Sequence, residues 1–191
     1  PAGACPACDG LGYQEFFDPA RVVMHPQLSL AGGAIRGWDR RNAYYFQMIR
    51  ALATHYRFDI EAPWSTLPEA VRDAVLNGSG KTDVEFKYTD SRGRAAKRAH
   101  PFEGILPNLE RRYRETESAT VREEIGKYRG TRRCAQCDGA RLNADARSVH
   151  VGGHTLPQIA SLSVASAMEL FSTLTLAGWR GEVAARIVKE V

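Results

Sequence analysis

The sequence predicts an α+β fold, in which a helix-rich insertion domain with a small antiparallel sheet is built into a module of four cysteines. Apolar residues recur at helical spacing along much of the chain, which indicates several amphipathic helices. One segment, residues 83–89, instead alternates apolar and polar side chains, as a half-buried strand does. All four cysteines fall in two matching pieces that lie far apart in the sequence. The 191 residues suffice for one domain with a core or for two small ones.

Two helices are predicted in the first half of the chain. Residues 40–59 carry an apolar stripe at helical spacing, which predicts an amphipathic helix. Residues 67–76 predict a second helix, with a cap at Ser65 or Thr66 and a stop at Gly78.

A hairpin and further helices are predicted downstream. The strand at residues 83–89 precedes a turn, and residues 95–102 return as its partner. Residues 105–128 are helical in pattern, in two pieces joined near residues 115–118. After the last cysteine the pattern predicts a short strand pair and two helices, over residues 147–159, 163–174 and 181–191.

The stretch VLNGSGKT, residues 75–82, is similar to the end of a phosphate-binding loop. The full motif requires glycine where the chain has Val75, and it follows a strand and opens a helix. Here a helix precedes the stretch and a strand follows it. We therefore predict no nucleotide site at this loop and interpret Gly78 and Gly80 as a helix C-cap and a connection. Lys81 remains an exposed cation that could touch a phosphate.

The cysteines form two C-x-x-C-D-G pieces, CPACDG and CAQCDG. The spacing turns both thiolates of a piece toward one ion, and the glycine permits the tight turn around sulfur. Together the two pieces supply the four thiolates of a closed, structural zinc site. We therefore predict one zinc ion per chain, bound by Cys5, Cys8, Cys134 and Cys137. The simplest architecture is a compact zinc module whose loop, 125 residues between positions 8 and 134, is an inserted domain.

Three other interpretations of the cysteines stay open at this point. Disulfides would require an oxidising compartment, for which nothing in the sequence argues. Thioredoxin-like pairs explain C-x-x-C but not its duplication with Asp-Gly. A DnaJ-like zinc domain repeats C-x-x-C-x-G-x-G, which residues 5–12 match, but the second piece has Arg141 in place of the last glycine.

Charge is unevenly distributed. The net charge is +4, but residues 18–133 hold 21 Lys and Arg against 15 Asp and Glu, and the remainder holds 5 against 7. An Arg-rich excess suits phosphate partners. No apolar stretch approaches the roughly 20 residues of a membrane helix, and no signal peptide is apparent. We expect a cytoplasmic location, and the abrupt start suggests a fragment of a longer protein.

Several long stretches resemble one known family: PAGACPACDGLG, FFDPARVVMHPQLSLAGGAIRGWDRRNAYYFQM, HPFEGILPNLERRYRETES, VREEI and CAQCDGARLNADARSV. They are similar to the UvrA family, the damage-recognising component of the ABC excinuclease in bacterial nucleotide excision repair. The resemblance runs along the whole chain. It implies that the four cysteines form the zinc module of the first of two ABC-type ATPase halves. The second half of such proteins keeps the same two cysteine pieces with a short loop between them.

The resemblance also implies a domain division. Residues 1–14 and 127–150 would be the two halves of the zinc module, and residues 15–126 the insertion domain that contacts DNA. Residues 151–191 would begin the signature domain with helices. The implied partner is double-stranded DNA, especially damaged DNA.

The ATPase apparatus of that family is absent from this sequence. We find no Walker A loop, Walker B carboxylate or L-S-G-G-type signature, and LSLAGGA at residues 28–34 is only superficially similar. The resemblance implies that ATP binds only in missing parts of the parent. It also implies that the parent forms a homodimer and works with UvrB, whose docking domain is absent here. We predict no catalytic residue and no cofactor-binding residue besides the zinc ligands.

Three basic segments offer candidate DNA contacts: AIRGWDRR, SRGRAAKR at the predicted hairpin tip, and ERRYR on a helix surface. The candidates are Arg36, Arg40, Arg41, Arg92, Arg94, Lys97, Arg98, Arg111, Arg112 and Arg114. For Arg111 and Arg112 the alternative is plain ion pairing with neighbouring glutamates. Trp38, which looks exposed beside Gly37, is better interpreted as a packing anchor than as a wedge between bases. A second functional class, a protein-interaction or scaffold module, also stays open.

Overall fold

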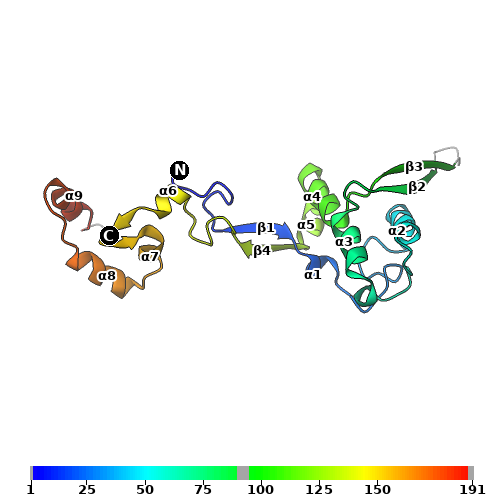
Figure 1. The fold of residues 1–191 in the computed structure, drawn as a ribbon, viewed down its shortest axis with the longest axis horizontal. Coiled ribbons are helices and arrows are strands. Elements are labelled where there is room, and N and C mark those ends of the chain that lie inside the picture. The colour runs from blue at the N-terminus through cyan, green and yellow to red at the C-terminus, as the bar shows by residue number, and fades with distance from the viewer. Residues whose placement is uncertain (1, 90–94, 189–191) are drawn as a thin grey trace. The chain divides into compact units, whose positions relative to one another are not determined.

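The computed structural model describes residues 2–89 and 95–188 (Figure 1). Its contacts divide the chain into two compact units, Pro1–Gln14 with Thr131–Val191 and Glu15–Gly130. The strands β1 (Tyr13–Phe17) and β4 (Arg129–Arg133) pair in a two-stranded sheet, and the division falls within both strands. Neither strand was predicted, because their side chains do not alternate between apolar and polar.

The unit Glu15–Gly130 is mainly helical, with one hairpin, which confirms the predicted α+β class. Its elements are α1 (Pro19–Val22), α2 (Ala43–Tyr56), the 3-10 turn η1 (Trp64–Thr66), α3 (Glu69–Asn77), β2 (Asp83–Thr89), β3 (Ala95–Pro101), α4 (Ile105–Glu115) and α5 (Ala119–Gly126).

Helix α2 follows the predicted amphipathic pattern. The Asn42 side chain caps its start by accepting a hydrogen bond from the Tyr45 amide at 3.2 Å. The helix ends at Arg57, which adopts the left-handed conformation with φ 56°. Ile49 and Leu52 are fully buried from this helix, so one face belongs to the core and the other faces solvent.

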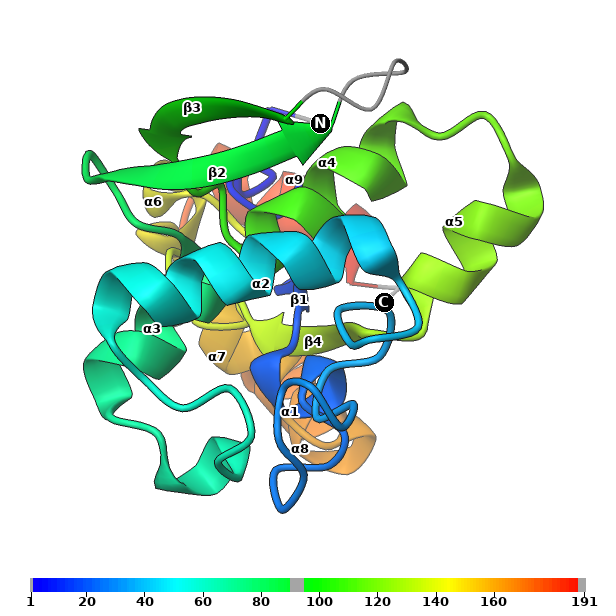
Figure 2. The same cartoon turned by 90° about the vertical axis from the view of Figure 1, so that its right-hand side faces the viewer.

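The predicted hairpin is confirmed as an antiparallel pair of β2 and β3, with Phe86 opposite Arg98 and Lys87 opposite Lys97. Val84 and Phe86 are buried, as the alternation indicated. In both views the hairpin lies alongside α2 (Figures 1 and 2), and the Gln47 side-chain amide of α2 donates to the Lys87 carbonyl of β2.

The core of this unit confirms the packing role of Trp38 and corrects its apparent exposure. Only 3% of Trp38 is exposed. Its ring lies 4.2 Å from that of Tyr45 and 6.1 Å, edge-on, from that of Phe102. Trp38 therefore joins the segment before α2 to the segment after the hairpin, and it is not available as a wedge.

The predicted start of α3 is wrong. Ser65 and Thr66 lie in η1 and do not cap the helix, whose N-cap is Pro68 without a side-chain hydrogen bond. The physical reason is Leu67, which is extended at ψ 143°. A residue before proline is disfavoured in the helical region, so the helix begins only after Pro68. The predicted stop at Gly78 is confirmed.

The other unit carries short elements outside the cysteine pieces: α6 (Ala144–Arg147), β5 (His150–Val151), β6 (His154–Thr155), α7 (Leu156–Ala160), α8 (Val164–Thr173) and α9 (Trp179–Ile187). The strand pair and the last two helices confirm the sequence pattern. Helix α7 was not predicted, although a capping box of Thr155 and Gln158 marks its start. Within the described ranges, no helix is both long and apolar enough to span a membrane.

The first half of the GSGK loop, Gly78 and Ser79, is packed, whereas Gly80 and Lys81 are exposed. A β-carbon at Gly78 would lie 2.6 Å from the Phe102 carbonyl oxygen, and one at Gly104 would lie 2.5 Å from the Gly78 amide nitrogen. Both glycines have φ near 100° with extended ψ, a region restricted almost to glycine. Ser79 adds a further contact between the same two segments, because its hydroxyl accepts a hydrogen bond from the Phe102 amide at 2.8 Å. These close backbone contacts explain why glycine occupies positions 78 and 104.

We therefore expect Gly78→Ala to lower the free energy of unfolding by about 3 kcal/mol or more, since it combines backbone strain with a clash. Gly37→Ala is the matched control, because Gly37 also has positive φ, 81°, but has open space where the β-carbon would lie. Gly37→Ala should lower the free energy of unfolding by only about 1–2 kcal/mol, which is the cost of placing a residue with a β-carbon in the left-handed conformation. Urea unfolding measures both, and equal losses would contradict the packing account.

Candidate metal centre and basic surface

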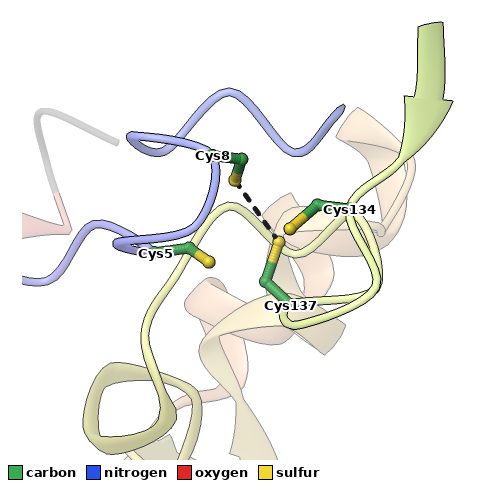
Figure 3. Close-up of side chains that lie close together, drawn as sticks. All are labelled: Cys5, Cys8, Cys134 and Cys137. Carbon is green, nitrogen blue, oxygen red and sulfur yellow. Dashed lines mark hydrogen bonds between the residues drawn. The ribbon is translucent and has the colours of Figure 1, made fainter. Parts of the chain in front are cut away.

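The four cysteines converge in one buried cluster (Figure 3). Their sulfur atoms all lie within 4.8 Å of one another, although Cys8 and Cys137 stand 129 positions apart in sequence. At most 5% of any of the four is exposed. The sequence pattern thus correctly anticipated that these residues meet.

The two cysteine pieces are related by local symmetry. The Cys5 amide donates to the Arg141 carbonyl at 2.9 Å, and the Cys134 amide donates to the Gly12 carbonyl at 3.0 Å. Asp9 and Asp138 each have φ 48°, and the glycines that follow them have φ 77° and 78°. These reciprocal bonds hold the two pieces face to face.

Arg141 takes the place of the last glycine without changing the turn. Its φ is 66°, against 82° at Gly12. The mismatch noted in the sequence is therefore a difference of residue type, and the backbone conformation is shared. The left-handed conformation costs a non-glycine residue about 1–2 kcal/mol.

The geometry suits a tetrahedral metal ion and excludes a disulfide between Cys8 and Cys137. Zinc–sulfur bonds of about 2.3 Å place the sulfurs of a tetrahedral site about 3.8 Å apart. The Cys8 and Cys137 sulfurs are 3.7 Å apart, whereas a disulfide requires about 2.05 Å. All four cysteines are free. The residues present therefore fit a zinc ion, the metal that four thiolates favour.

The electrostatics of the cluster differ between its two pieces. Burial raises the pKa of the Cys8 thiol to about 11, although the Gly12 amide donates to its sulfur at 3.2 Å. Hydrogen bonds from backbone amides lower the pKa of the Cys134 thiol to about 7, and the bond from the Cys137 amide has the largest effect. Burial alone would raise this pKa. A bound cation would stabilise the thiolate form of all four groups, so metal binding releases protons.

The basic candidates have diverse surroundings in the unit Glu15–Gly130. Arg92 and Arg94 lie outside the described residues. Ion pairs engage Arg40 with Glu61, Arg41 with Asp39, Lys97 with Glu85, Arg111 with Glu103 and Glu115, and Arg114 with Glu110. The Arg112 guanidinium lies 5.6 Å from the centre of the Tyr45 ring. Arg36 and Arg98 are exposed and form no ion pair with any residue that the structure describes.

Asp39 is the buried partner of one of these cations. It is 2% exposed and accepts from the Arg41 amide at 2.9 Å and from both Nε and Nη2 of Arg41, at 2.8 and 2.6 Å. The Arg41 guanidinium therefore holds the pKa of Asp39 below its usual range. The rest of the Arg41 side chain is exposed, so Asp39 orients a cation that still faces solvent.

The contacts of Arg111 agree with the alternative prediction, that it forms ion pairs with neighbouring glutamates. Glu103 accepts from Arg111 Nε at 2.8 Å and from Nη2 at 3.1 Å, and Glu115 accepts from Nη1 at 3.2 Å. These bonds lower the pKa of Glu103, with a smaller contribution from the Asn108 amide. Arg111 thus links the second half of α4 to the segment before the helix.

A groove of about 750 Å³ lies between α2 and the hairpin. Arg40 and Lys97, from two of the predicted basic segments, both line it. Arg50 and Lys87 line it too, and they were not predicted. Their positions in the sequence pattern could have indicated both residues. Arg50 lies on the polar face of the amphipathic helix, and Lys87 is at an exposed position of the alternating strand.

We expect Asp39→Asn to lower the free energy of unfolding by about 2 kcal/mol at neutral pH, because hydrogen bonds to a charged group contribute about 1.5–3 kcal/mol. Since the folded pKa of Asp39 is depressed, its stabilisation is present above the unfolded pKa of about 3.9 and is lost as pH falls through the folded value. The difference between the two proteins should therefore shrink toward acidic pH. Asp59→Asn, at an exposed carboxylate, is the control for urea unfolding, and a difference that persists in acid would contradict this account.

Comparisons with known proteins agree with one family. The family model of the UvrA DNA-binding domain matches residues 18–127. The chain is 61% identical over all 191 residues to the UvrABC system protein A of Xylella fastidiosa strain Temecula1, and 58% identical to that of Escherichia coli strain K12. It spans 20% of the length of these relatives.

The solved structure of UvrA2 from Deinococcus radiodurans matches the fold with a TM-score of 0.63 at 24% identity, over 90% of this chain and 22% of that one. The sequence resemblance, the family model and the fold converge. The chain belongs to the UvrA family and contains its DNA-binding domain.

Proposed function

We propose that the chain is a DNA-binding, damage-sensing module of bacterial nucleotide excision repair. The observation that carries this proposal is the match of residues 18–127 to the UvrA DNA-binding domain. That range nearly coincides with the compact unit Glu15–Gly130, which contains all the basic candidates. We propose duplex DNA, especially damaged DNA, as the partner of this unit.

The physical basis is contact with the DNA backbone. Lesions differ chemically, so a general damage sensor cannot depend on base edges and instead uses phosphate contacts and the deformability of a weakened duplex. Arg36 and Arg98 are exposed cations suited to such contacts. Arg41 and Lys97 are exposed within ion pairs. At Lys97 a phosphate can replace the exposed Glu85 carboxylate at little cost, whereas at Arg41 it would share the guanidinium with the buried Asp39.

We further propose that one zinc ion occupies the cysteine cluster and has a structural role. Cys5 and Cys8 precede the unit Glu15–Gly130, and Cys134 and Cys137 follow it, so one ion would fix both of its ends. A closed site of four thiolates leaves no position for a substrate. We assign no catalytic residue, and propose that ATP, UvrB and a second copy of the parent protein are bound by other parts of that parent.

The alternative is a protein-interaction or scaffold module without DNA binding of its own. The ion pairs of Arg40, Arg111 and Arg114 favour it, because paired side chains are common on ordinary protein surfaces. Salt dependence separates the two functions, since phosphate contacts release counterions and a neutral protein interface does not.

The zinc proposal predicts one zinc ion per chain by elemental analysis. Cys134→Ser should abolish stoichiometric zinc binding, while Ala135→Ser, an exposed change between the same two cysteines, should not. Acidification should release the metal, because protons compete for the thiolates. Zinc-free wild type, or full zinc content in Cys134→Ser, would refute the site.

The DNA proposal predicts that affinity for a labelled duplex falls steeply between low and moderate salt. Replacing Arg92, Arg94, Lys97 and Arg98 with Ala should weaken lesion-bearing and undamaged duplexes alike, because backbone contacts carry no lesion information. Fluorescence anisotropy at two salt concentrations measures both effects. Absent or salt-independent binding by the wild type would favour the scaffold alternative.

A further inference from the structure

The groove between α2 and the β2–β3 hairpin offers a site that the basic segments alone do not define. We propose that it holds the sugar–phosphate backbone of one DNA strand, with Arg50 and Lys87 binding phosphate. The inference rests on the proposed function and specifies where in the unit Glu15–Gly130 the DNA is held. Its lining is Arg40, Ala43, Phe46, Gln47, Arg50, Ala51, Thr54, His55, Glu85, Lys87 and Lys97.

The groove is built from two tied walls. The Gln47 side chain of α2 donates to the Lys87 carbonyl of β2, which fixes the distance between helix and strand. Arg50 lies one helical turn beyond Gln47, on the same face of α2. Lys97 stands directly opposite Lys87 across the hairpin. Cations therefore line both walls, on elements that secondary structure and this hydrogen bond hold in place.

The charge of the lining favours a polyanion. Among the lining residues that the structure describes, four are Lys or Arg and one, Glu85, is a carboxylate. Glu85 pairs with Lys97 at 2.9 Å, and Glu61, outside the groove, pairs with Arg40. Arg50 and Lys87 form no ion pair with any residue in the described ranges. Lys87 and Lys97 are also like charges directly opposite on two strands, and Glu85 forms an ion pair with Lys97 alone of the two.

The size and floor of the groove suit a single backbone. Its volume of about 750 Å³ is that of a pocket for a small ligand or a few linked groups, and is too small for a duplex. Ala43 and Ala51 are small, and Phe46 offers an apolar floor for the sugars. The Gln47 side-chain amide has a second N–H besides the one donated to Lys87, and this N–H can donate to a phosphate oxygen, whereas the Thr54 hydroxyl already donates to the Arg50 carbonyl.

The test is the double variant Arg50→Gln/Lys87→Gln of the 191-residue chain, with a labelled duplex. Each lost phosphate contact reduces the slope of log affinity against log salt by about 0.9, so the slope should become shallower by about 1.8. Both side chains are exposed, so the melting temperature should stay unchanged. The charge-preserving pair Arg50→Lys/Lys87→Arg should retain the wild-type slope.

The matched control is Arg57→Gln/Lys127→Gln, which removes the same charge at exposed positions outside the groove. Its slope should stay at the wild-type value. Equal slopes for the groove variant and the wild type would overturn the groove site while leaving the proposed function intact. Equal reductions in groove and control variants would overturn it too, by showing an effect of net charge alone. A wild type that binds no duplex, but binds an acidic peptide through Arg50 and Lys87, would refute DNA as the occupant and the proposed function together.

Discussion

The convergence of four thiols is the constraint on which the chain's organisation depends. Two cysteine pieces meet across 129 sequence positions, and reciprocal hydrogen bonds between Cys5 and Arg141 and between Cys134 and Gly12 hold them in register. The two ends of the segment between them are thereby brought to one place. The four sulfurs have the spacing of a tetrahedral metal site, and an ion bound there would add its binding free energy to this closure.

Within the unit Glu15–Gly130, packing and charge are separated by element. Trp38, Phe86 and Phe102 join the segment before α2, the hairpin and the segment before α4 into one core. The polar sides of α2 and of the hairpin remain exposed and gather cations around a groove. Many of the other basic side chains form ion pairs with carboxylates, as Arg111 does with Glu103 and Glu115. A rigid core with a few free cations is suited to contacts that depend on backbone shape more than on base identity.

Local signals in the sequence predicted much of this fold. Alternation in residues 83–89 identified β2, and Gly78 marked the end of α3. Both signals are local, because a strand is recognised from its alternating side chains and a helix end from a single glycine. The pairing of β1 with β4 was missed, since it depends on the cysteines bringing distant segments together. The start of α3 was misplaced because the conformational restriction at Leu67 before Pro68 was overlooked. At the site, the cysteine spacing was informative, whereas the partners of Arg41 and Arg111 and the groove at Arg50 depend on tertiary contacts.

Hydrogen–deuterium exchange of the chain with and without a saturating duplex tests the central claim most directly, that DNA is held by the unit Glu15–Gly130. The account predicts slower exchange on DNA binding in peptides covering the exposed side of α2 and the hairpin strands β2 and β3. Peptides covering Cys5, Cys8, Cys134 and Cys137 should exchange at the same rate in both states. Protection confined to the cysteine pieces, or absent throughout residues 15–130 when the duplex is bound, would contradict it.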